Sequence, residues 1–218
     1  MGLRTRLARA KTLLWLDAVL ERHDLHQIAQ LAAQANIDLI MVRQLHATLN
    51  QTAECIRVLQ EETRSTSMIV GAVGSTAVAE LVNPDAFIVA HSFHPLQAHR
   101  FGLVGAICRT RLEFSIALAH DQVDFIIVTQ PLAPAAVAVA PPQLVDSKPW
   151  FVEVDCIAQG KDSIEQGARS LAIDLDYRSG YLDREHCDDA QLSQYSAMLV
   201  SLWQHDMTAV SLAALRLS

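Results

Sequence analysis

The sequence lacks any apolar run of the length that a membrane span needs. No window approaches roughly 18 uninterrupted apolar positions, although 51% of the 218 residues are hydrophobic. Residues 1–11 are basic and precede an apolar run, but Asp17 interrupts that run and no small-residue cleavage pattern follows. We therefore expect a soluble, cytoplasmic protein without an export signal.

Cysteine is scarce, and basic charge is not in excess. The four cysteines show no CxxC or other metal-ligand spacing, which predicts reduced thiols in a cytoplasmic protein. Cys55 lies in a helical pattern, and Cys108 and Cys156 each follow a strand pattern. We therefore expect all three to be small buried core residues rather than reactive thiols. The net charge of −7 argues against a broad nucleic-acid footprint, which requires clustered Lys and Arg. A small-molecule ligand fits this composition better.

The chain does contain a repeating pattern of short apolar runs. They are spaced about 20 residues apart, and most are followed by a polar, helix-like stretch. The runs cover residues 13–16, 39–42, 68–70, 86–90, 103–107, 125–128, 150–154 and 171–173. Each is too short for a buried helix and mostly lacks strict alternation, as is typical of parallel strands covered on both faces. The pattern predicts a single (β/α)8 barrel domain over residues 1–218, with its chemistry at the carboxyl ends of the strands.

Helical segments lie between these runs. Residues 25–32 and 53–60 each place apolar side chains on one face, and residues 112–120 form a further helical stretch. Polar residues 48–51 are N-cap candidates for the second helix, and Asn83-Pro84-Asp85 ends the third. These faces are expected to pack on the barrel.

The segment 131–149 breaks this pattern, because its five prolines exclude a long regular helix. The sixth helix of the barrel is therefore expected to be shortened or replaced by a loop. The uncharged stretch 133–140 is either an ordered apolar arm against a neighbouring subunit or a cover for its own barrel. With an amphipathic helix expected at about 190–207, whose apolar face includes Leu202 and Trp203, it predicts a homodimer.

The order of the first motifs resembles a known family. Arg6-Leu7-Ala8-Arg9 precedes a strand that ends in Asp17, Asp24-Leu25 opens a helix, and residues 36–40 run into Met41-Val42-Arg43-Gln44-Leu45. This order resembles the start of a thiamine-phosphate synthase, a family of small (β/α)8 barrels that includes thiazole tautomerases. The resemblance extends over roughly residues 5–180, including Val123-Asp124-Phe125 before the sixth strand. It implies transfer of a pyrimidinylmethyl group from its diphosphate to a thiazole phosphate, with Mg²⁺ as cofactor where that activity is kept.

Most positions that the family uses for function are different here. The second strand of the family ends in Gln-x-Arg-x-Lys, and only Arg43 matches it, with Met41 at the Gln position and Leu45 at the Lys position. Gly71-Ala72 stand where the family has an Asn-Asp pair after the third strand, and His91-Ser92-Phe93 lacks the second acidic ligand. The resemblance therefore implies that two of three diphosphate-facing groups and the metal carboxylates are missing.

The later strand ends depart further from the family. Thr129-Gln130-Pro131 contains no lysine after the sixth strand, and Asp155-Cys156-Ile157 replaces the Gly-Gly phosphate loop after the seventh. A phosphate site aims backbone N–H groups and a helix amino end at an anion, and carboxylates there repel it. Two like charges about 4 Å apart, at an effective dielectric near 20, cost on the order of 4 kcal/mol.

The candidate ligand-binding residues follow the strands. Arg43 either binds an anion or is salt-bridged to Asp17 or Asp38. The carboxylates after the first, seventh and eighth strands either form an acidic pocket for a cation or an amine, or cap helices and face solvent. His91, with His94 and His99, lacks the spacing and the third ligand of a metal site. The full candidate set is Asp17, Arg43, His91, Gln130, Asp155 and Asp174, with Asp176 as a further carboxylate.

Three functions remain open at this point. The missing functional groups favour a thiamine-phosphate-synthase-like barrel with a degenerate site, kept as a binding or regulatory module. The resemblance allows an active thiamine-phosphate synthase. The third alternative is a barrel enzyme of different chemistry, with Asp155, Asp174, Asp176 and His91 as acid–base groups.

Overall fold

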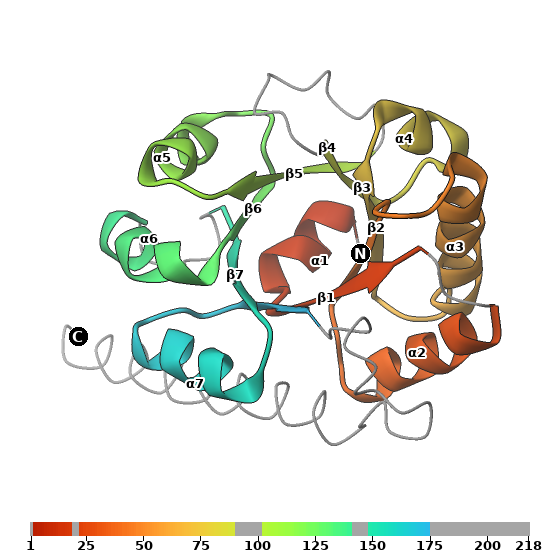
Figure 1. Cartoon of the computed structure of the whole chain (residues 1–218), viewed down its shortest axis with the longest axis horizontal. Helices are drawn as coiled ribbons and strands as arrows, with labels where there is room; N and C mark the ends of the chain where they lie inside the picture. The colour runs from red at the N-terminus through yellow and green to blue at the C-terminus, as the bar shows by residue number, and fades with distance from the viewer. Residues whose placement is uncertain (1, 19–21, 90–101, 141–147, 175–218) are drawn as a thin grey trace, which may run out of the picture.

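The computed structural model describes residues 2–18, 22–89, 102–140 and 148–174 and forms a closed parallel barrel of eight strands (Figure 1). Each strand pairs with the next along the chain, and β8 returns to pair with β1. The strands are β1 (Thr12–Asp17), β2 (Leu39–Arg43), β3 (Ile69–Gly74), β4 (Ala86–Val89), β5 (Leu103–Cys108), β6 (Phe125–Val128), β7 (Trp150–Val154) and β8 (Leu171–Asp174). The predicted (β/α)8 barrel is confirmed.

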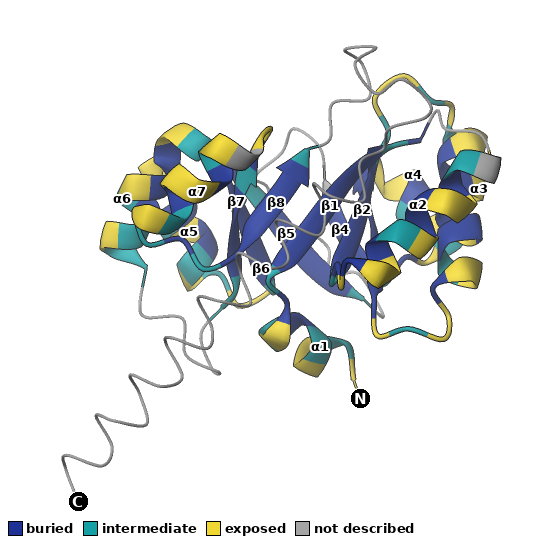
Figure 2. Ribbon diagram, turned by 90° about the horizontal axis from the view of Figure 1, so that it is seen from below, coloured by how far each residue is buried: buried dark blue, intermediate teal, exposed yellow. Residues whose placement is uncertain are grey.

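Side chains along each strand alternate between two apolar clusters. Leu13, Trp15 and Phe151 belong to the cluster inside the barrel, whereas Leu14 and Leu16 belong to the cluster between the strands and the helices. The strands are therefore buried on both faces (Figure 2), which explains their uninterrupted apolar sequence. Gly105 keeps the interior open for aromatic side chains, since a Cβ there would lie 2.3 Å from Phe125.

The helices around the strands are α2 (Arg22–Gln34), α3 (Leu49–Glu62), α4 (Thr76–Val82), α5 (Arg111–Ala119) and α7 (Ile157–Glu165). The predicted cap of the second helix is confirmed, because Thr48 and Gln51 form a capping box at the start of α3. Thr110 and Glu113 form a second box at α5. Asn83 ends α4 in a left-handed conformation with φ 47°.

The sixth helix is short, as predicted. A 3-10 turn, η1 (Gln130–Leu132), leads into α6 (Ala133–Val139). Ala133 and Ala136 are fully buried, and Val137 packs on the core outside the strands. Of the two alternatives for this segment, the structure therefore shows the second: α6 covers its own barrel. The homodimer stays a prediction, and its second element at about 190–207 lies outside the described residues.

One helix was not predicted from the sequence. α1 (Leu3–Arg9) lies across the amino-terminal end of the barrel (Figures 1 and 2), where Leu7 enters the interior cluster. Arg6 Nη1 donates to the backbone carbonyls of Ser67 and Met68, at 3.2 and 3.1 Å. The basic start of the chain therefore closes the barrel at this end.

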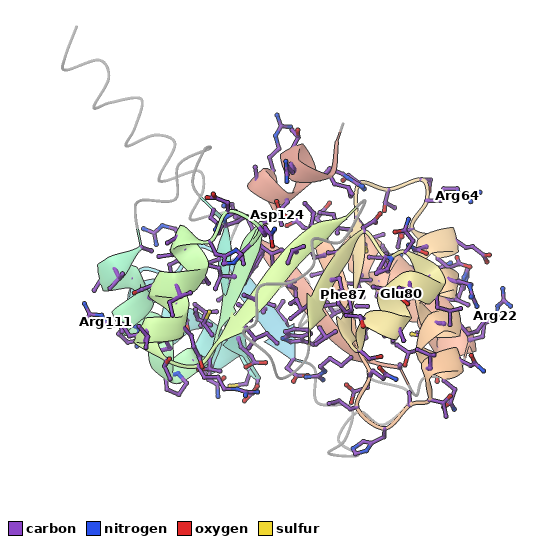
Figure 3. All side chains as sticks on the ribbon, turned by 90° about the horizontal axis from the view of Figure 1, so that it is seen from above. Arg22, Arg64, Glu80, Phe87, Arg111 and Asp124 are labelled. Atoms are coloured by element: carbon purple, nitrogen blue, oxygen red, sulfur yellow. The ribbon has the colours of Figure 1, made fainter. Side chains whose placement is uncertain are left out.

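Three aspartates immediately before even-numbered strands hold the amino-terminal end together. Asp38 Oδ2 accepts the backbone N–H groups of Lys11 at 2.7 Å and Thr12 at 3.0 Å. In the same way Asp85 accepts the N–H of Val70, and Asp124 accepts that of Val104, at 3.1 and 2.9 Å. Asp124 also pairs with Arg4 of α1, next to which it lies in Figure 3.

The cysteines separate into two kinds. Cys55 and Cys108 are buried, as predicted, and burial raises the pKa of each thiol to about 12. Cys156 is exposed at the start of α7, so its prediction as a buried core residue is wrong. Cys187 lies outside the described residues.

No described helix is both long enough and apolar enough to cross a bilayer.

Candidate site at the carboxyl end of the barrel

Four ionisable side chains occupy interior-facing positions at the carboxyl ends of neighbouring strands. Asp17, Arg43, Glu153 and Asp174 alternate in step with the interior residues of β1, β2, β7 and β8. Asp17 lies beside Arg43 in the register of β1 and β2, and Trp15 lies beside Asp174 in that of β1 and β8. We call the carboxyl-terminal end of the barrel its mouth, and these four side chains the mouth cluster.

Arg43 is held by two carboxylates. Its Nε donates to Asp17 Oδ1 at 2.9 Å, and its two terminal nitrogens bind both oxygens of Asp174, with Nη2 at 2.8 Å from Oδ1. The side chains of Arg43 and Asp174 are each only 20% exposed, and that of Asp17 is 11% exposed. The guanidinium carbon lies 5.5 Å from the ring centroid of Trp15, which is a cation–π distance. Every nitrogen of Arg43 therefore has a carboxylate partner.

The electrostatics of Arg43 follow from these contacts. Burial alone lowers its pKa, but the hydrogen bonds and negative charges of Asp174 and Asp17 outweigh burial, so the pKa is raised. Of the two partners that the sequence offered, Asp17 is the one that Arg43 binds. Asp38 binds backbone N–H groups at the opposite end of the barrel.

Glu153 is a further candidate residue that the sequence alone does not single out. It lies inside β7, whereas the predicted candidates follow the strands; the alternation of β7 is the signal that places its side chain inside the barrel. Burial raises the pKa of the Glu153 carboxyl, and the negative charge of Asp174 raises it further, against the opposing charge of Arg43. The cluster thus contains a carboxyl group whose proton is retained to higher pH than usual.

The strand register also fixes the depth of these side chains. Interior residues of a barrel of shear 8 form levels of four, contributed by alternate strands. Following the register from strand to strand places Arg43 and Asp174 at one level, and the next level inward contains Trp15, Val73, Ile107 and Glu153. Glu153 is therefore the deepest charge of the cluster, in an otherwise apolar level.

The other predicted residues lie near the mouth without joining the cluster. Gln130 begins η1 directly after β6 and is half-buried. Asp155 follows β7 and is exposed, and its backbone N–H donates to Gln159 Oε1 at 2.8 Å. A ligand-binding role for either residue stays a prediction. His91, His94, His99 and Asp176 lie outside the described residues.

The described residues do not fit the Mg²⁺ that the resemblance implies. Within them, no three side chains of His, Cys, Asp or Glu converge in a way that could hold a metal ion. β3 extends to Gly74, so the residues that follow it are Ser75 and Thr76 rather than the Gly71-Ala72 pair expected from the sequence. Neither of these supplies the carboxylate that the family places there.

Comparisons with known proteins identify the fold alone. The chain matches no family model and no curated protein sequence. A thiamine phosphate pyrophosphorylase from Pyrococcus furiosus is similar in structure with a TM-score of 0.67, over 92% of this chain and 98% of its own, at 12% identity. The alpha subunit of tryptophan synthase from Legionella pneumophila gives 0.65, over 92% and 99%, at 8% identity. A Burkholderia cenocepacia dihydropteroate synthase gives 0.63, over 93% of each chain, at 13% identity.

Proposed function

We propose that this chain is a thiamine-phosphate-synthase-like barrel that lacks efficient synthase activity. It serves instead as a binding or regulatory module that takes a small molecule at its mouth. The observation that carries the proposal is the pairing of Arg43 with Asp17 and Asp174. Arg43 is the one residue of the family's strand-two motif that this sequence keeps.

The pairing argues against a diphosphate substrate. An arginine recognises phosphate oxygens with the same bidentate N–H pairs that it offers to a carboxylate, and Asp174 already occupies that pair. A diphosphate at the mouth would have to displace a carboxylate and then lie beside two of them. Leu45, at the position of the family's lysine, is 48% exposed and supplies no compensating charge.

The synthase assay tests this proposal directly. Purified protein supplied with the pyrimidine diphosphate, the thiazole phosphate and Mg²⁺ should form thiamine phosphate at no more than a trace rate. Each lost electrostatic contact typically costs about 10²–10³ in rate. An active synthase in the same mixture is the positive control, and turnover of about 1 s⁻¹ or more by this chain would contradict the proposal.

A matched variant separates the pairing from other causes. Asp17→Asn with Asp174→Asn removes both charges that neutralise Arg43 while retaining side-chain size. We expect this double variant to bind inorganic phosphate more tightly than the unmodified protein. Equal phosphate affinity in both proteins would show that the carboxylates do not exclude anions.

A barrel enzyme of different chemistry is the second candidate, and Glu153 is the observation that favours it. A carboxyl group with a raised pKa, facing the interior at the functional end of a barrel, is suited to general acid–base work. The described strand-end residues that the sequence suggested for this role, Asp155 and Asp174, are exposed and paired with Arg43, respectively.

A further inference from the structure

Two polar groups at the level below Arg43 have no hydrogen-bond partner in the described part of the chain. One is the Glu153 carboxyl, which is half-buried and therefore reachable from the mouth. The other is the indole N–H of Trp15, a residue that is only 1% exposed. Buried polar groups are rarely left without partners, because the lost hydrogen bond with water is not replaced. The buried indole N–H of Trp15 therefore lacks the acceptor that such groups usually have, and the half-buried Glu153 carboxyl at the same level is open to a donor.

The charge around Glu153 defines the sign of that ligand. The mouth cluster contains three carboxylates and one guanidinium, so negative charge is in excess when all four groups are ionised. Asp155 and Arg109, the further charges that act on Glu153, oppose each other. Asp17 and Asp174 are already bound to Arg43, whereas Glu153 is not. An anion is disfavoured here, and a cation is favoured.

We propose that the mouth binds a small organic cation that also carries a hydrogen-bond acceptor: its charged N–H group pairs with Glu153, and its acceptor takes the indole N–H of Trp15. The inference rests on the proposed small-molecule-binding function and names the chemical class of the ligand. Protonated amino alcohols and amino amides have this pair of groups. Arg43 is a positioning residue in this arrangement, because it covers the Trp15 ring and holds the two neighbouring carboxylates away from the ligand.

The proposal predicts a definite pH dependence. The charged groups that act on Glu153 are Asp174 from β8, Arg43 from β2, Asp155 after β7 and Arg109 after β5. A cation binds the ionised form of Glu153 better than the protonated form, so its affinity rises as pH increases through the Glu153 titration. A neutral ligand of the same shape has no such dependence on this group.

Ethanolamine is the probe, since it has a protonated amine and a hydroxyl acceptor on the smallest possible frame. Ethylene glycol is its neutral match, and glycolate is its anionic match. Because the chain contains three tryptophans, the indole N–H signals in a ¹⁵N–¹H spectrum give a local readout, and Trp15→Phe assigns the signal of Trp15. With so few atoms the probe should bind only in roughly the millimolar range. Ethanolamine should shift the Trp15 signal saturably, and the two matches should not.

Two variants test the assigned groups. Glu153→Gln keeps the size of the side chain and should weaken ethanolamine binding at least about tenfold, because it removes the charge partner. Trp15→Phe keeps an aromatic ring and should weaken binding through the lost N–H, as followed by the heat of binding. Glu165→Gln makes the same change as Glu153→Gln at an exposed position on α7 and should leave affinity unchanged.

Several outcomes would overturn the proposal: equal binding of glycolate or ethylene glycol, no saturable shift with ethanolamine, or unchanged affinity in Glu153→Gln. The unmodified protein provides an independent check, since ethanolamine affinity must be higher at about pH 8 than at about pH 5. The synthase assay is separate from these measurements. Loss of amine binding together with absent synthase turnover would remove this inference and leave the degenerate-synthase proposal standing.

Discussion

The two ends of the barrel use aspartate differently. At the amino-terminal end, Asp38, Asp85 and Asp124 accept backbone N–H groups of the preceding strand. At the carboxyl end, Asp17 and Asp174 bind a side chain, that of Arg43. A carboxylate that binds backbone N–H groups stabilises the strand itself. A carboxylate that binds a side chain can be substituted together with that side chain while the strands stay paired. The comparison places backbone-stabilising aspartates at the amino-terminal end and an ion-pair cluster at the carboxyl end, where barrels of this fold usually have their active sites.

The sharpest test of this division is Asp38→Ala at the amino-terminal end. The substitution leaves the backbone N–H groups of Lys11 and Thr12 without their acceptor and also removes the bond from the Thr12 hydroxyl, at 3.0 Å. Donors left unsatisfied cost about 1–3 kcal/mol each, so the free energy of unfolding should fall by about 3 kcal/mol in urea denaturation. Asp38→Asn keeps one acceptor oxygen and should lose less. A loss below about 0.5 kcal/mol in Asp38→Ala would contradict a structural role for these aspartates.

Arg43→Ala is the corresponding substitution at the mouth. It leaves Asp17 and Asp174 partly buried without their counter-charge, which should lower the free energy of unfolding by about 2 kcal/mol. In a double-mutant cycle with Asp174→Asn, the second substitution should cost much less in the Arg43→Ala background than in the unmodified protein. Arg109→Ala removes an exposed arginine near the mouth and serves as the control. Additive effects of Arg43→Ala and Asp174→Asn would show that the pair contributes no coupling.

The sequence was sufficient for the strands and insufficient for the site. Eight apolar runs predicted eight strands because two-sided burial imposes a continuous apolar pattern on a parallel strand. The sequence leaves the partner of Arg43 open between Asp17 and Asp38. These two residues lie 21 positions apart in the chain and at opposite ends of the closed barrel. Only the alternation along β1 and β2 distinguishes them, because it turns Asp17 and Arg43 to the same interior.

What the sequence leaves open has physical reasons as well. The apolar runs do not single out Glu153, because a charge inside such a run indicates a strand position without showing that it faces the barrel interior. The sequence leaves the apolar stretch 133–140 between a partner surface and a cover for its own barrel, and in α6 its small side chains pack on the outside of the barrel. Val137 approaches Gly167, where a Cβ would lie 2.9 Å away in a backbone with φ 105°. Such close contacts depend on tertiary geometry that composition does not encode.

Glu153→Gln should have the opposite sign from Asp38→Ala, although both remove a carboxylate, and its effect should be the smallest of the three. The pKa of Glu153 is raised in the folded chain, so the stability that its protonation supports is present below the ordinary value of 4.5 and is lost as pH rises through the folded-state pKa. At neutral pH the buried charge is therefore destabilising. Glu153→Gln should raise the free energy of unfolding by roughly 1 kcal/mol or less, and the melting temperature should rise slightly with it. The gain should shrink as pH falls toward 4.5, which calorimetry at a series of pH values can follow. A destabilised Glu153→Gln variant at neutral pH would show that Glu153 supports the fold, as the aspartates of the other end do, and would remove the contrast between the two ends.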